Sequence, residues 1–248
     1  MDFQNALSDF GISLNSKQTE QFELYYKLLV SWNEKMNLTA ITDREEVYVK
    51  HFLDSLSFVK TNPSTEDFRL IDVGTGAGFP GIPLKILYPK AHITLMDSLA
   101  KRVTFLNEVI EELSLNEEGS IEAVHSRAED LAKNKEYREQ FDYAVSRAVA
   151  NLCTLSEYCL PFVKVGGVFV SYKSEKATEE VKDAKKAVFL LGGSFGEEIS
   201  FILPGSDLKR TLVMIEKKSV TSTKYPRKAG MPSKNPLGTA HQTTYVVL

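Results

Sequence analysis

The amino-acid sequence predicts an α/β fold in which a mostly parallel sheet of seven strands ends on a reversed strand and follows an N-terminal helical extension. Three observations lead to this prediction. Helical apolar patterns occupy the first 60 residues, apolar strand-like runs then alternate with helical runs as far as residue 193, and two final strand-like runs are joined by only six residues. Alternation of this kind builds a parallel sheet covered on both faces, whereas a six-residue connection requires an antiparallel pair.

Two amphipathic helices are expected in the extension. Residues 16–37, SKQTEQFELYYKLLVSWNEKMN, place apolar side chains every three or four positions, and Ser16 is a suitable N-terminal cap. Residues 43–59 repeat the pattern, and a polar stretch that contains a proline then ends the helical part. We therefore divide the chain into a helical extension, residues 1–60, and a domain of residues 61–248.

The β-α alternation begins after this boundary. Five apolar runs of strand length each lead into a run with helical spacing, the order expected for a doubly wound sheet. The final antiparallel pair is expected at 197–204 and 211–218, and the proline-rich segment 221–237 is expected to be a loop that becomes ordered on contact. The first five strands are expected at 69–74, 91–98, 120–126, 141–148 and 166–173, and the helices that follow them at 82–88, 101–115, 128–140, 151–163 and 175–193.

Composition excludes several classes of protein. Hydrophobic residues make up 43% of the chain and charged residues 25%, as in ordinary globular domains, so neither disorder nor a fibre is expected. No apolar run is long enough to cross a bilayer, and the N-terminus lacks the basic-then-apolar order of a signal peptide. We therefore expect a cytoplasmic protein without membrane association.

Cysteine spacing and charge carry further information. Cys153 and Cys159 have neither metal-ligand spacing nor a disulfide framework, so buried thiols and no metal site are expected. The net charge is −3, but the segment from Pro204 to the C-terminus carries +6 and the rest −9. A basic segment can hold a phosphate backbone even on an acidic protein, and it can equally be a solvated tail. No apolar stripe is left over, so a monomer is expected.

The loop after the first strand, DVGTGAGFPG from Asp72 to Gly81, contains two nucleotide-binding patterns. An acidic residue followed by Gly74, Gly76 and Gly78 is typical of the turn that binds S-adenosylmethionine. Read from Gly76, the same loop contains G-x-G-x-x-G, the dinucleotide fingerprint. Both interpretations depend on glycines that let the backbone turn tightly and let a ligand approach it closely.

The surrounding residues favour S-adenosylmethionine. A pyrophosphate needs free amides at the helix N-terminus, and Pro80 and Pro83 remove two of them. The carboxylate of Asp72 suits a cationic sulfonium and would repel a pyrophosphate. Asp97, at the end of the second strand, fits the ribose of either cofactor. A reversed last strand is typical of class I methyltransferases, so we predict the Rossmann-like fold of that class. The structural alternative is a glycine turn whose only role is to pack a helix on the sheet.

Several motifs, in order, resemble the RsmG family, also called the glucose-inhibited division protein B family. They are WNEKMNLTAI, HFLDSL, DVGTGAGFPGIPL, FDYAVSRAVA, a YK pair and KYPRKAGMPSKNPL, and they run from about Trp32 to Leu237. The family's members are bacterial methyltransferases that methylate N7 of a guanine in 16S ribosomal RNA. The resemblance implies a class I fold, S-adenosylmethionine as cofactor, the 16S rRNA of the 30S subunit as partner and a cytoplasmic location. One departure is Ser174, where the family usually has glycine.

The resemblance also implies roles for individual residues. Gly74 and Phe79 would contact the cofactor from the loop, Ala128 and Glu129 would line its adenine side, and Arg147 would lie where cofactor and base meet. Together with the glycine pattern and its two acidic residues, this gives an expected cofactor-binding set of Asp72, Gly74, Gly76, Gly78, Phe79, Asp97, Ala128, Glu129 and Arg147.

The sequence lacks the motifs that methylation of other base atoms would require, and methylation of guanine N7 requires none of them. N7 carries an exposed lone pair, so no proton has to be removed and positioning can carry most of the catalysis. Methylation of exocyclic amines commonly shows an Asn/Asp-Pro-Pro-aromatic motif after the fourth strand, where this chain has SRAVAN. Methylation at pyrimidine C5 needs a cysteine nucleophile, usually after a proline, and neither cysteine follows one.

Arg147 is the candidate catalytic residue. It follows the fourth strand, at the end of the sheet where open α/β folds bind ligands, and its guanidinium can hold guanine O6 or a phosphate. The structural alternative is an ion pair with Asp142 or Glu129. Arg102, on the helix after the second strand, faces either the cofactor rim or solvent.

Four residues are candidates for contact with the substrate. Asn37 and His51, with the neighbouring Asp54, would cap the guanine pocket or order the helices against the domain. Lys173, after the fifth strand, and Arg227, in the C-terminal loop, would grip RNA phosphates or lie on a solvated surface.

Three other functions remain open at this point. A small-molecule methyltransferase would have the same fold. A nicotinamide-dependent oxidoreductase would use Gly76, Gly78 and Gly81 for its dinucleotide. A ribosome assembly factor would retain the fold without catalysis.

Overall fold

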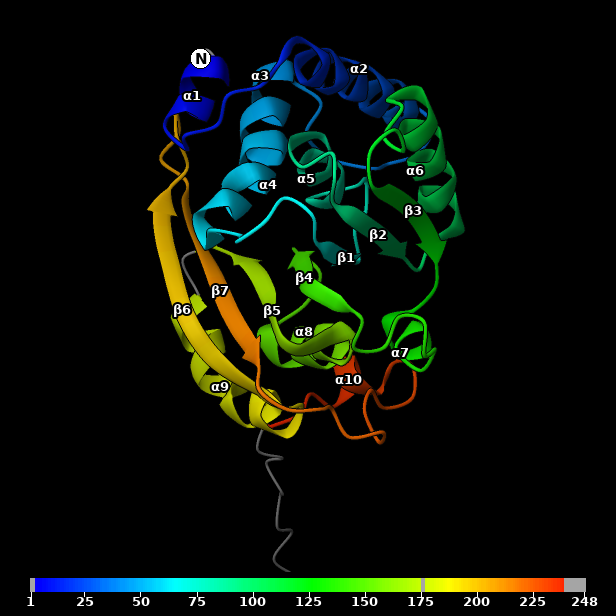
Figure 1. Ribbon diagram of the computed structural model, residues 1–248, viewed down its shortest axis with the longest axis vertical. Coiled ribbons are helices and arrows are strands. Elements are labelled where there is room, and N and C mark those ends of the chain that lie inside the picture. The colour runs from blue at the N-terminus through cyan, green and yellow to red at the C-terminus, as the bar shows by residue number, and fades with distance from the viewer. Residues whose placement is uncertain (1–2, 175–176, 239–248) are drawn as a thin grey trace, which may run out of the picture.

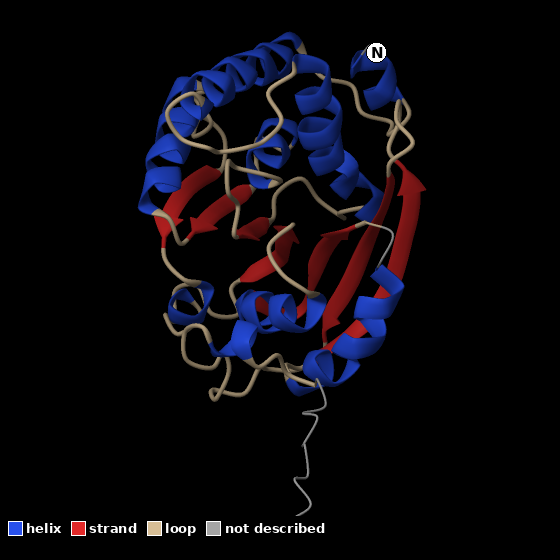
Figure 2. Ribbon diagram, turned by 180° about the vertical axis from the view of Figure 1, so that it is seen from behind, coloured by secondary structure: helices blue, strands red, loops and turns tan. Residues whose placement is uncertain are grey.

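Every run expected as a strand enters one seven-stranded sheet with helices on both faces, as the computed structural model of residues 3–174 and 177–238 shows (Figures 1 and 2). The strand order is β3-β2-β1-β4-β5-β7-β6. Pairs among the first five strands are parallel, and β7 is antiparallel to both of its neighbours. The predicted fold class is therefore confirmed. The strands are β1 (Arg69–Val73), β2 (His92–Asp97), β3 (Ser120–His125), β4 (Phe141–Arg147), β5 (Val163–Lys173), β6 (Gly193–Ile202) and β7 (Lys209–Lys217).

The strand order creates a crevice between β1 and β4. From β1 the chain proceeds outward to β2 and β3, and it then returns to place β4 on the other side of β1. Connections therefore leave the carboxyl ends of β1 and β4 in opposite directions, and ligands bind at such a switch point in open α/β sheets. Asp72 pairs with Val145 in the register of these two strands.

The N-terminal helices lie over one face of the sheet with two helices of the domain. Asn15 caps the first long helix in a capping box with Gln18, so the cap precedes Ser16, the position expected from the sequence. The helix expected at 43–59 is a continuous helical run whose middle has π geometry. The helices on this face are α1 (Phe3–Ser8), α2 (Ser16–Asn33), α3 (Arg44–Val47), η1 (Tyr48–Leu53), α4 (Asp54–Leu56), η2 (Ser57–Thr61), α5 (Gly81–Leu87) and α6 (Ala100–Glu112).

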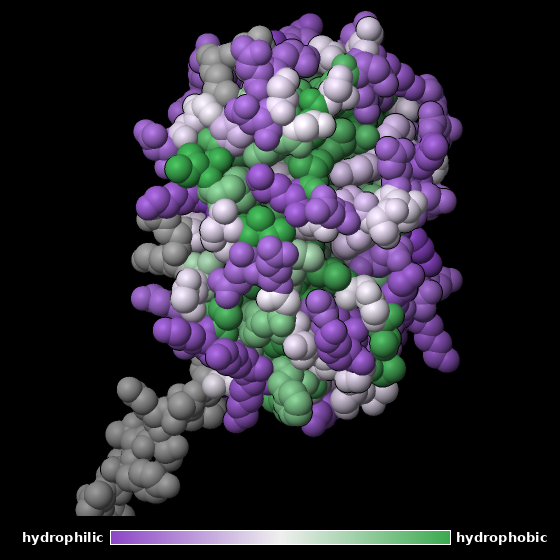
Figure 3. Space-filling model, turned by 60° about the vertical axis from the view of Figure 1, so that its left-hand side comes forward, coloured by the Kyte–Doolittle hydropathy of each residue, from purple (hydrophilic) through white to green (hydrophobic). Residues whose placement is uncertain are grey.

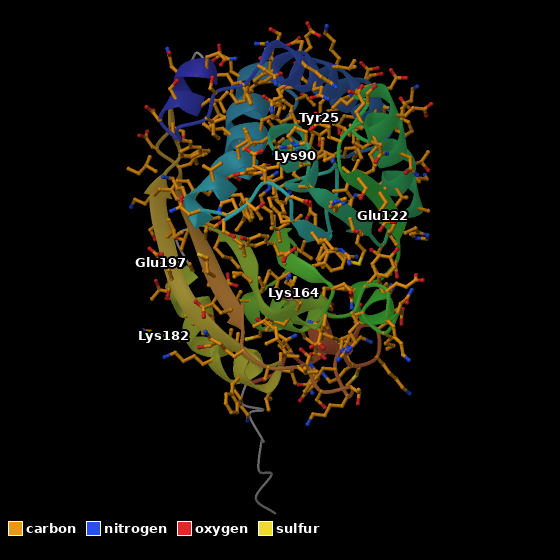
Figure 4. The ribbon with its side chains drawn as sticks, viewed as in Figure 1. Tyr25, Lys90, Glu122, Lys164, Lys182 and Glu197 are labelled. Atoms are coloured by element: carbon orange, nitrogen blue, oxygen red, sulfur yellow. The ribbon has the colours of Figure 1, made fainter. Side chains whose placement is uncertain are left out.

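One hydrophobic core joins these helices to the sheet. Tyr25 of α2, labelled in Figure 4, stacks on Phe52 of η1 at 5.3 Å between ring centroids and packs on Phe79 of the glycine loop at 5.4 Å. Its hydroxyl donates to the carbonyl of Ala77 in the same loop. The N-terminal helices therefore support the glycine loop directly. The division of the chain into two parts at residue 60 stays a prediction.

The other face of the sheet is covered by helices from the second half of the chain. The helix expected at 128–140 ends at Leu131, and turns follow it. From these turns the Arg138 side chain donates to the carbonyls of Thr221 and Tyr225 in the C-terminal segment. Within the proline-rich segment expected to be a loop, one helical turn forms. The helices on this face are α7 (Ala128–Leu131), α8 (Leu152–Cys159), η3 (Leu160–Phe162), α9 (Ala177–Leu190) and α10 (Met231–Lys234).

Some expectations fall on residues 1–2, 175–176 and 239–248, which lie outside the described residues. They include the start of the helix expected at 175–193, the first two residues of the expected helical extension and the last ten residues of the expected domain. Within the described residues, no helix combines the length and the apolar character needed to span a membrane. On the face drawn in Figure 3, charged and polar side chains surround small apolar groups.

Gly81 begins α5 where that helix packs on the sheet. A Cβ built there would lie 2.2 Å from Leu95 Cδ2 and 3.0 Å from Asp72 Oδ2. We predict that Gly81→Ala lowers the free energy of unfolding by about 1–3 kcal/mol, because the added methyl group overpacks a buried contact. Urea denaturation measures the change. Gly196→Ala is the control, since its nearest neighbour would be the flexible end of Glu216 at 3.3 Å; equal effects at both positions would contradict the prediction.

Candidate functional site

A cleft of about 1100 Å³ opens at the carboxyl ends of the central strands. Its floor is the glycine loop after β1, and its sides come from the ends of β2, β3, β4 and β5 and from the N-terminal helices. The sequence predicted a ligand site at this edge of the sheet. Of the expected site residues, those that line the cleft are Gly74, Gly76, Phe79, Asp97, Ala128, Glu129, Arg147, His51 and Lys173.

The glycine loop turns through backbone conformations that suit glycine. Gly74, Gly76 and Gly78 have φ angles of 75°, 64° and 97°, in the left-handed region. A Cβ at Gly76 would meet no atom within 4 Å, so this side of the loop is open. A Cβ at Gly78 would lie 2.7 Å from the Tyr25 hydroxyl oxygen, so this glycine allows α2 to approach. Gly76 faces the cleft and Gly78 packs away from it.

Asp72 lies beneath the loop and does not line the cleft. Its side chain is fully buried, and Oδ2 accepts hydrogen bonds from Gly81 N at 2.8 Å and Thr75 Oγ1 at 2.6 Å. Oδ1 has no partner among the described residues. Burial raises the pKa of this carboxyl group to about 7, although both hydrogen bonds act in the opposite direction. The structure thus gives Asp72 the task of holding the two ends of the loop together, where the sequence suggested proximity to a cation.

Asp97 closes the other side of the loop. One carboxylate oxygen, Oδ2, accepts from Gly76 N at 2.9 Å and from the Arg102 guanidinium at 3.2 Å, and Oδ1 accepts from Leu99 N at 2.9 Å. Arg102 therefore lies at the rim of the cleft, partly exposed, in an ion pair. A carboxylate has about four acceptor positions, so Asp97 keeps capacity for a ligand hydroxyl.

Arg147 lies at the end of β4 with its side chain only 13% exposed. Its Nη1 donates to Asp54 Oδ2 at 2.9 Å and to the carbonyls of Lys50 and His51 at 3.3 Å. The guanidinium also lies 5.1 Å from the centroid of the Phe79 ring. The expected alternative partners, Asp142 and Glu129, are engaged elsewhere: Asp142 with Lys164, and Glu129 with Gly230 N.

Arg210 is one of the cleft residues that the sequence did not indicate. It comes from β7 and donates through Nε to Asp54 Oδ1 at 2.9 Å, so that Asp54 binds two arginines. In the sequence Arg210 appeared only as one of the charges of the basic segment, and the antiparallel pairing of β7 with β5 brings it beside Arg147. The one signal available was its position directly before the last predicted strand, 211–218.

His51 caps one side of the cleft as a neutral ring. It stacks on Phe79 with 4.6 Å between centroids, and Nε2 lies 2.8 Å from Thr39 Oγ1. Burial, with the nearby Arg147 charge, lowers the pKa of His51 to about 4. Because Nδ1 faces the Arg147 guanidinium at 3.5 Å, both ring nitrogens have neighbours and neither is placed to take a proton from a substrate.

Lys173 holds the loop that follows β4. Its Nζ donates to the carbonyl of Ala150 at 3.0 Å and to Glu180 at 2.7 Å, and Glu180 also accepts from Leu152 N. The loop begins at Ala148, whose φ of 57° is uncommon for a residue with a side chain. Lys173 is therefore used to order the cleft wall, with its side chain 10% exposed.

Two expected substrate residues lie away from the cleft lining. Asn37 is exposed in the loop after α2, and the adjacent Leu38 and Thr39 line the cleft in its place. Arg227 forms a two-pronged ion pair with Glu157, with Nη2 to Oε2 at 2.6 Å and Nε to Oε1 at 2.9 Å. Its guanidinium is thus turned into the protein by a carboxylate that is itself fully buried.

In the part of the chain that the structure describes, no group of three or more His, Cys, Asp or Glu side chains is arranged to hold a metal ion. The two cysteines are buried thiols, and burial raises the pKa of both. The acidic residues described in the cleft are bound to amides or bases. The site therefore offers fixed charges and hydrogen bonds, which can act on a reaction by positioning the reactants.

Comparisons with known proteins agree with this geometry. The model of the family described as rRNA small subunit methyltransferase G matches residues 18–201. Among the relatives, proteins named ribosomal RNA small subunit methyltransferase G from Lachnoclostridium phytofermentans and Acetivibrio thermocellus are each 53% identical to this chain. The first match covers 95% of this chain and 96% of the relative, and the second covers 93% of each.

Solved structures show a similar fold at low sequence identity. A SAM-dependent methyltransferase from Aquifex aeolicus superimposes with a TM-score of 0.52 at 17% identity, over 75% of this chain and 97% of that one. A predicted O-methyltransferase from Agrobacterium tumefaciens gives 0.50 at 20% identity, over 68% of this chain and 80% of that one. These likenesses place the chain in the class I methyltransferase fold.

The raised pKa of Asp72 predicts a pH-dependent stability. The folded protein keeps the Asp72 proton up to about pH 7, whereas the unfolded chain loses it near pH 4. Wild type therefore loses stability as the pH rises through this window, by on the order of a few kcal/mol. The side-chain amide introduced by Asp72→Asn cannot ionise and retains an acceptor oxygen, so the stability of this variant relative to wild type should rise from pH 5 to pH 8.

Urea denaturation at the two pH values measures this difference. Asp207→Asn, at an exposed position, is the matched control for the change of charge. A relative stability of Asp72→Asn that stays constant, or falls toward pH 8, would show that the buried carboxyl group is ionised throughout.

Proposed function

Because this chain belongs to the rRNA small subunit methyltransferase G family, we propose that it transfers a methyl group from S-adenosylmethionine to N7 of a guanine in 16S rRNA. The observation that carries the proposal is the cleft, in which the glycine loop, Asp97 and Arg147 meet at the switch point of a class I methyltransferase fold. Each part of the cleft supports this reaction through a separate physical property.

The residues present fit S-adenosylmethionine. The open side of Gly76 lets a ligand approach the backbone, and Asp97 has acceptor capacity for ribose hydroxyls. Apolar walls from Val73, Met96 and Phe79 suit the sulfur and methyl groups. Asp72, below the loop, adds negative charge for a cation as far as it is ionised. When bound, the cofactor supplies an electrophilic methyl group on a positively charged sulfur.

The same carboxylates disfavour a dinucleotide. Gly76 N, which a pyrophosphate would need, already donates to Asp97. The carboxylate of Asp97 lies beside the loop, where it would repel phosphate charge, and Asp72 below the loop adds to this repulsion as it ionises. We therefore set aside the oxidoreductase alternative, and we take the family relationship to favour RNA over a small molecule as the methyl acceptor.

Guanine N7 is the acceptor that this cleft suits. It has a lone pair and no proton to lose, and the described His51, Asp54 and Glu180 side chains of the cleft are engaged by other protein groups, so none of these three is free to act as a base. Placing the nitrogen in line with the methyl group is then the main contribution of the protein.

We assign the placing of the base to Arg147. Asp54 and two backbone carbonyls fix its Nη1, while Nε has no bond to a described residue and Nη2 has only the long contact to His51. These donors remain for guanine O6 or a phosphate oxygen. The Phe79 ring beneath the guanidinium limits its movement.

The other substrate residues have smaller proposed parts. His51 covers the base pocket, Lys173 orders the loop after β4, and Asn37 lies on the RNA side of the entrance. Arg227 is left out of the substrate set, because Glu157 holds it inside the protein. We propose the 30S particle as partner, the cytoplasm as location and a monomer as the active form.

Labelled S-adenosylmethionine and purified 30S subunits test the proposal. N7-methylguanosine makes an RNA strand sensitive to borohydride followed by aniline, so cleavage should appear at one guanine of 16S rRNA after incubation with the enzyme. Free 16S rRNA in a parallel reaction shows which form is the substrate. Label on an exocyclic amine or a pyrimidine would contradict the proposed acceptor atom, and cofactor binding without any labelled RNA would support an assembly factor.

We predict that Arg147→Ala lowers kcat for 30S methylation by about 100-fold, because the acceptor loses its fixed position. The affinity for S-adenosylhomocysteine should change much less than kcat. The fold should survive, since Asp54 keeps its ion pair with Arg210. Single-turnover kinetics and calorimetry measure the two quantities.

Arg44→Ala is the matched control, because Arg44 pairs with Glu23 on the outer surface of the helices. A loss of cofactor affinity as large as the loss of kcat would move Arg147 from the substrate to the cofactor. Unchanged kcat would remove it from the site.

A further inference from the structure

The C-terminal strap, residues 219–237, is anchored to the protein by buried polar groups. Arg138 donates to the carbonyls of Thr221 at 2.7 Å and Tyr225 at 3.0 Å. Further along, Arg227 meets Glu157 of α8. A buried carboxylate is stable only with its partners in place, so these contacts determine the path of the strap.

Some of the basic residues near the C-terminus are used inside the protein. Eight Lys or Arg residues follow Pro204, and at least four of them form ion pairs with carboxylates in the described chain, one of which, Lys218 with Glu216, is exposed. They include Lys217, which is fully buried between Glu139 and the carbonyl of Leu160. The segment therefore has less free positive charge than its sequence suggests, and its ordered path calls for another explanation.

The strap reaches the cleft through α10, which lies against α8 (Figure 1). Gly230 N donates to Glu129 Oε1 at 2.8 Å, and Thr154 Oγ1 donates to the carbonyl of Pro232 at 3.2 Å. These bonds bring Ser233 into the lining of the cleft beside Tyr158 of α8.

The strand order shows which part of the cleft this is. Arg147 follows β4, the glycine loop follows β1, Asp97 ends β2, and Glu129 follows β3, in the order of the sheet. If the ribose lies at Asp97 and the methyl group between the glycine loop and Arg147, the adenine lies at the β3 end. Ser233 and Tyr158 line the cleft with Ala128 and Glu129, on that side.

We propose that Ser233 and Tyr158 form the outer wall of the adenosine subsite, and that the strap holds this wall in place. The inference rests on the proposed function only for the identity of the cofactor. The Ser233 hydroxyl donates to the carbonyl of Gly230 at 3.1 Å, so its oxygen remains to accept from the adenine amino group or a ribose hydroxyl. The Tyr158 ring gives an aromatic flank, and its hydroxyl can donate to or accept from the same groups. The Gly230 amide binds one oxygen of the buried Glu129 carboxylate, which leaves the other oxygen for an amino group of the ligand.

Calorimetry without RNA tests the assignment on the full chain. Ser233→Ala and Tyr158→Phe each remove one hydroxyl, so each should weaken the binding of S-adenosylhomocysteine by about 2- to 10-fold, the value of one hydrogen bond. The same loss is expected with 5′-methylthioadenosine, which has the adenosine part and lacks the amino-acid tail. Controls are Ser222→Ala and Tyr225→Phe, identical changes elsewhere on the strap that do not touch the cleft lining, and both should bind like wild type.

Two results would overturn the inference. Unchanged affinity in both variants would remove Ser233 and Tyr158 from the subsite, and a loss with S-adenosylhomocysteine alone would place them at its amino-acid end. RNA takes no part in these binding measurements. They can therefore be interpreted even if the 30S methylation assay fails. If wild type binds neither ligand, the proposed cofactor itself fails, and this inference fails with it.

Discussion

The carboxylate of Asp54 is the interaction on which the arrangement of the cleft depends. It is 6% exposed and lies between two guanidinium groups, that of Arg147 at 2.9 Å and that of Arg210 at 2.9 Å. The three residues come from α4, β4 and β7. One buried carboxylate therefore joins the N-terminal helices, the parallel part of the sheet and the reversed strand. Removing this carboxylate would leave two arginines with uncompensated charge. The ion pairs of Asp54 therefore hold the N-terminal helices and the sheet together around one site.

This bridge also separates charge within the cleft. Two guanidinium groups around one carboxylate leave a net positive charge at the end where Arg147 lies, which suits an anionic RNA. Asp97 and Glu129 lie beyond the glycine loop from Arg147, and Asp72 lies under the loop with a pKa of about 7. The end of the cleft at Arg147 thus suits the proposed anionic substrate, and the carboxylates at the other end suit the hydroxyl and amino groups of the proposed cofactor. In the proposed methyl transfer the protein fixes the relative position of two molecules. The fixed separation of charge in the cleft helps to orient them.

Local pattern was enough to predict the fold and one half of the site. Period and turn residues placed each strand, the glycine pattern and the rule for open sheets indicated Gly74, Asp97 and Arg147, and the family resemblance added Glu129; all four line one cleft. What local pattern could not supply was pairing over long distances in the chain. Arg210 reaches Asp54 across 156 positions and Arg227 reaches Glu157 across 70. A base in a loop looks solvated in the sequence until the fold brings a buried carboxylate to it, so the pairing of Arg227 with Glu157 could not be predicted from local pattern.

The helical run beside the cleft illustrates how local geometry serves the bridge. Residues Tyr48–Leu53 adopt π geometry, a form that appears often at functional sites. Within this turn the carbonyls of Lys50 and His51 accept from Arg147, and the His51 ring lies over Phe79. An arginine at the end of a strand has five donors and several possible orientations. With Nη1 bound by Asp54 and these two carbonyls, and with Phe79 below its plane, few orientations remain. The helices N-terminal to the sheet therefore determine how Arg147 faces the cleft, although the residue itself belongs to the sheet.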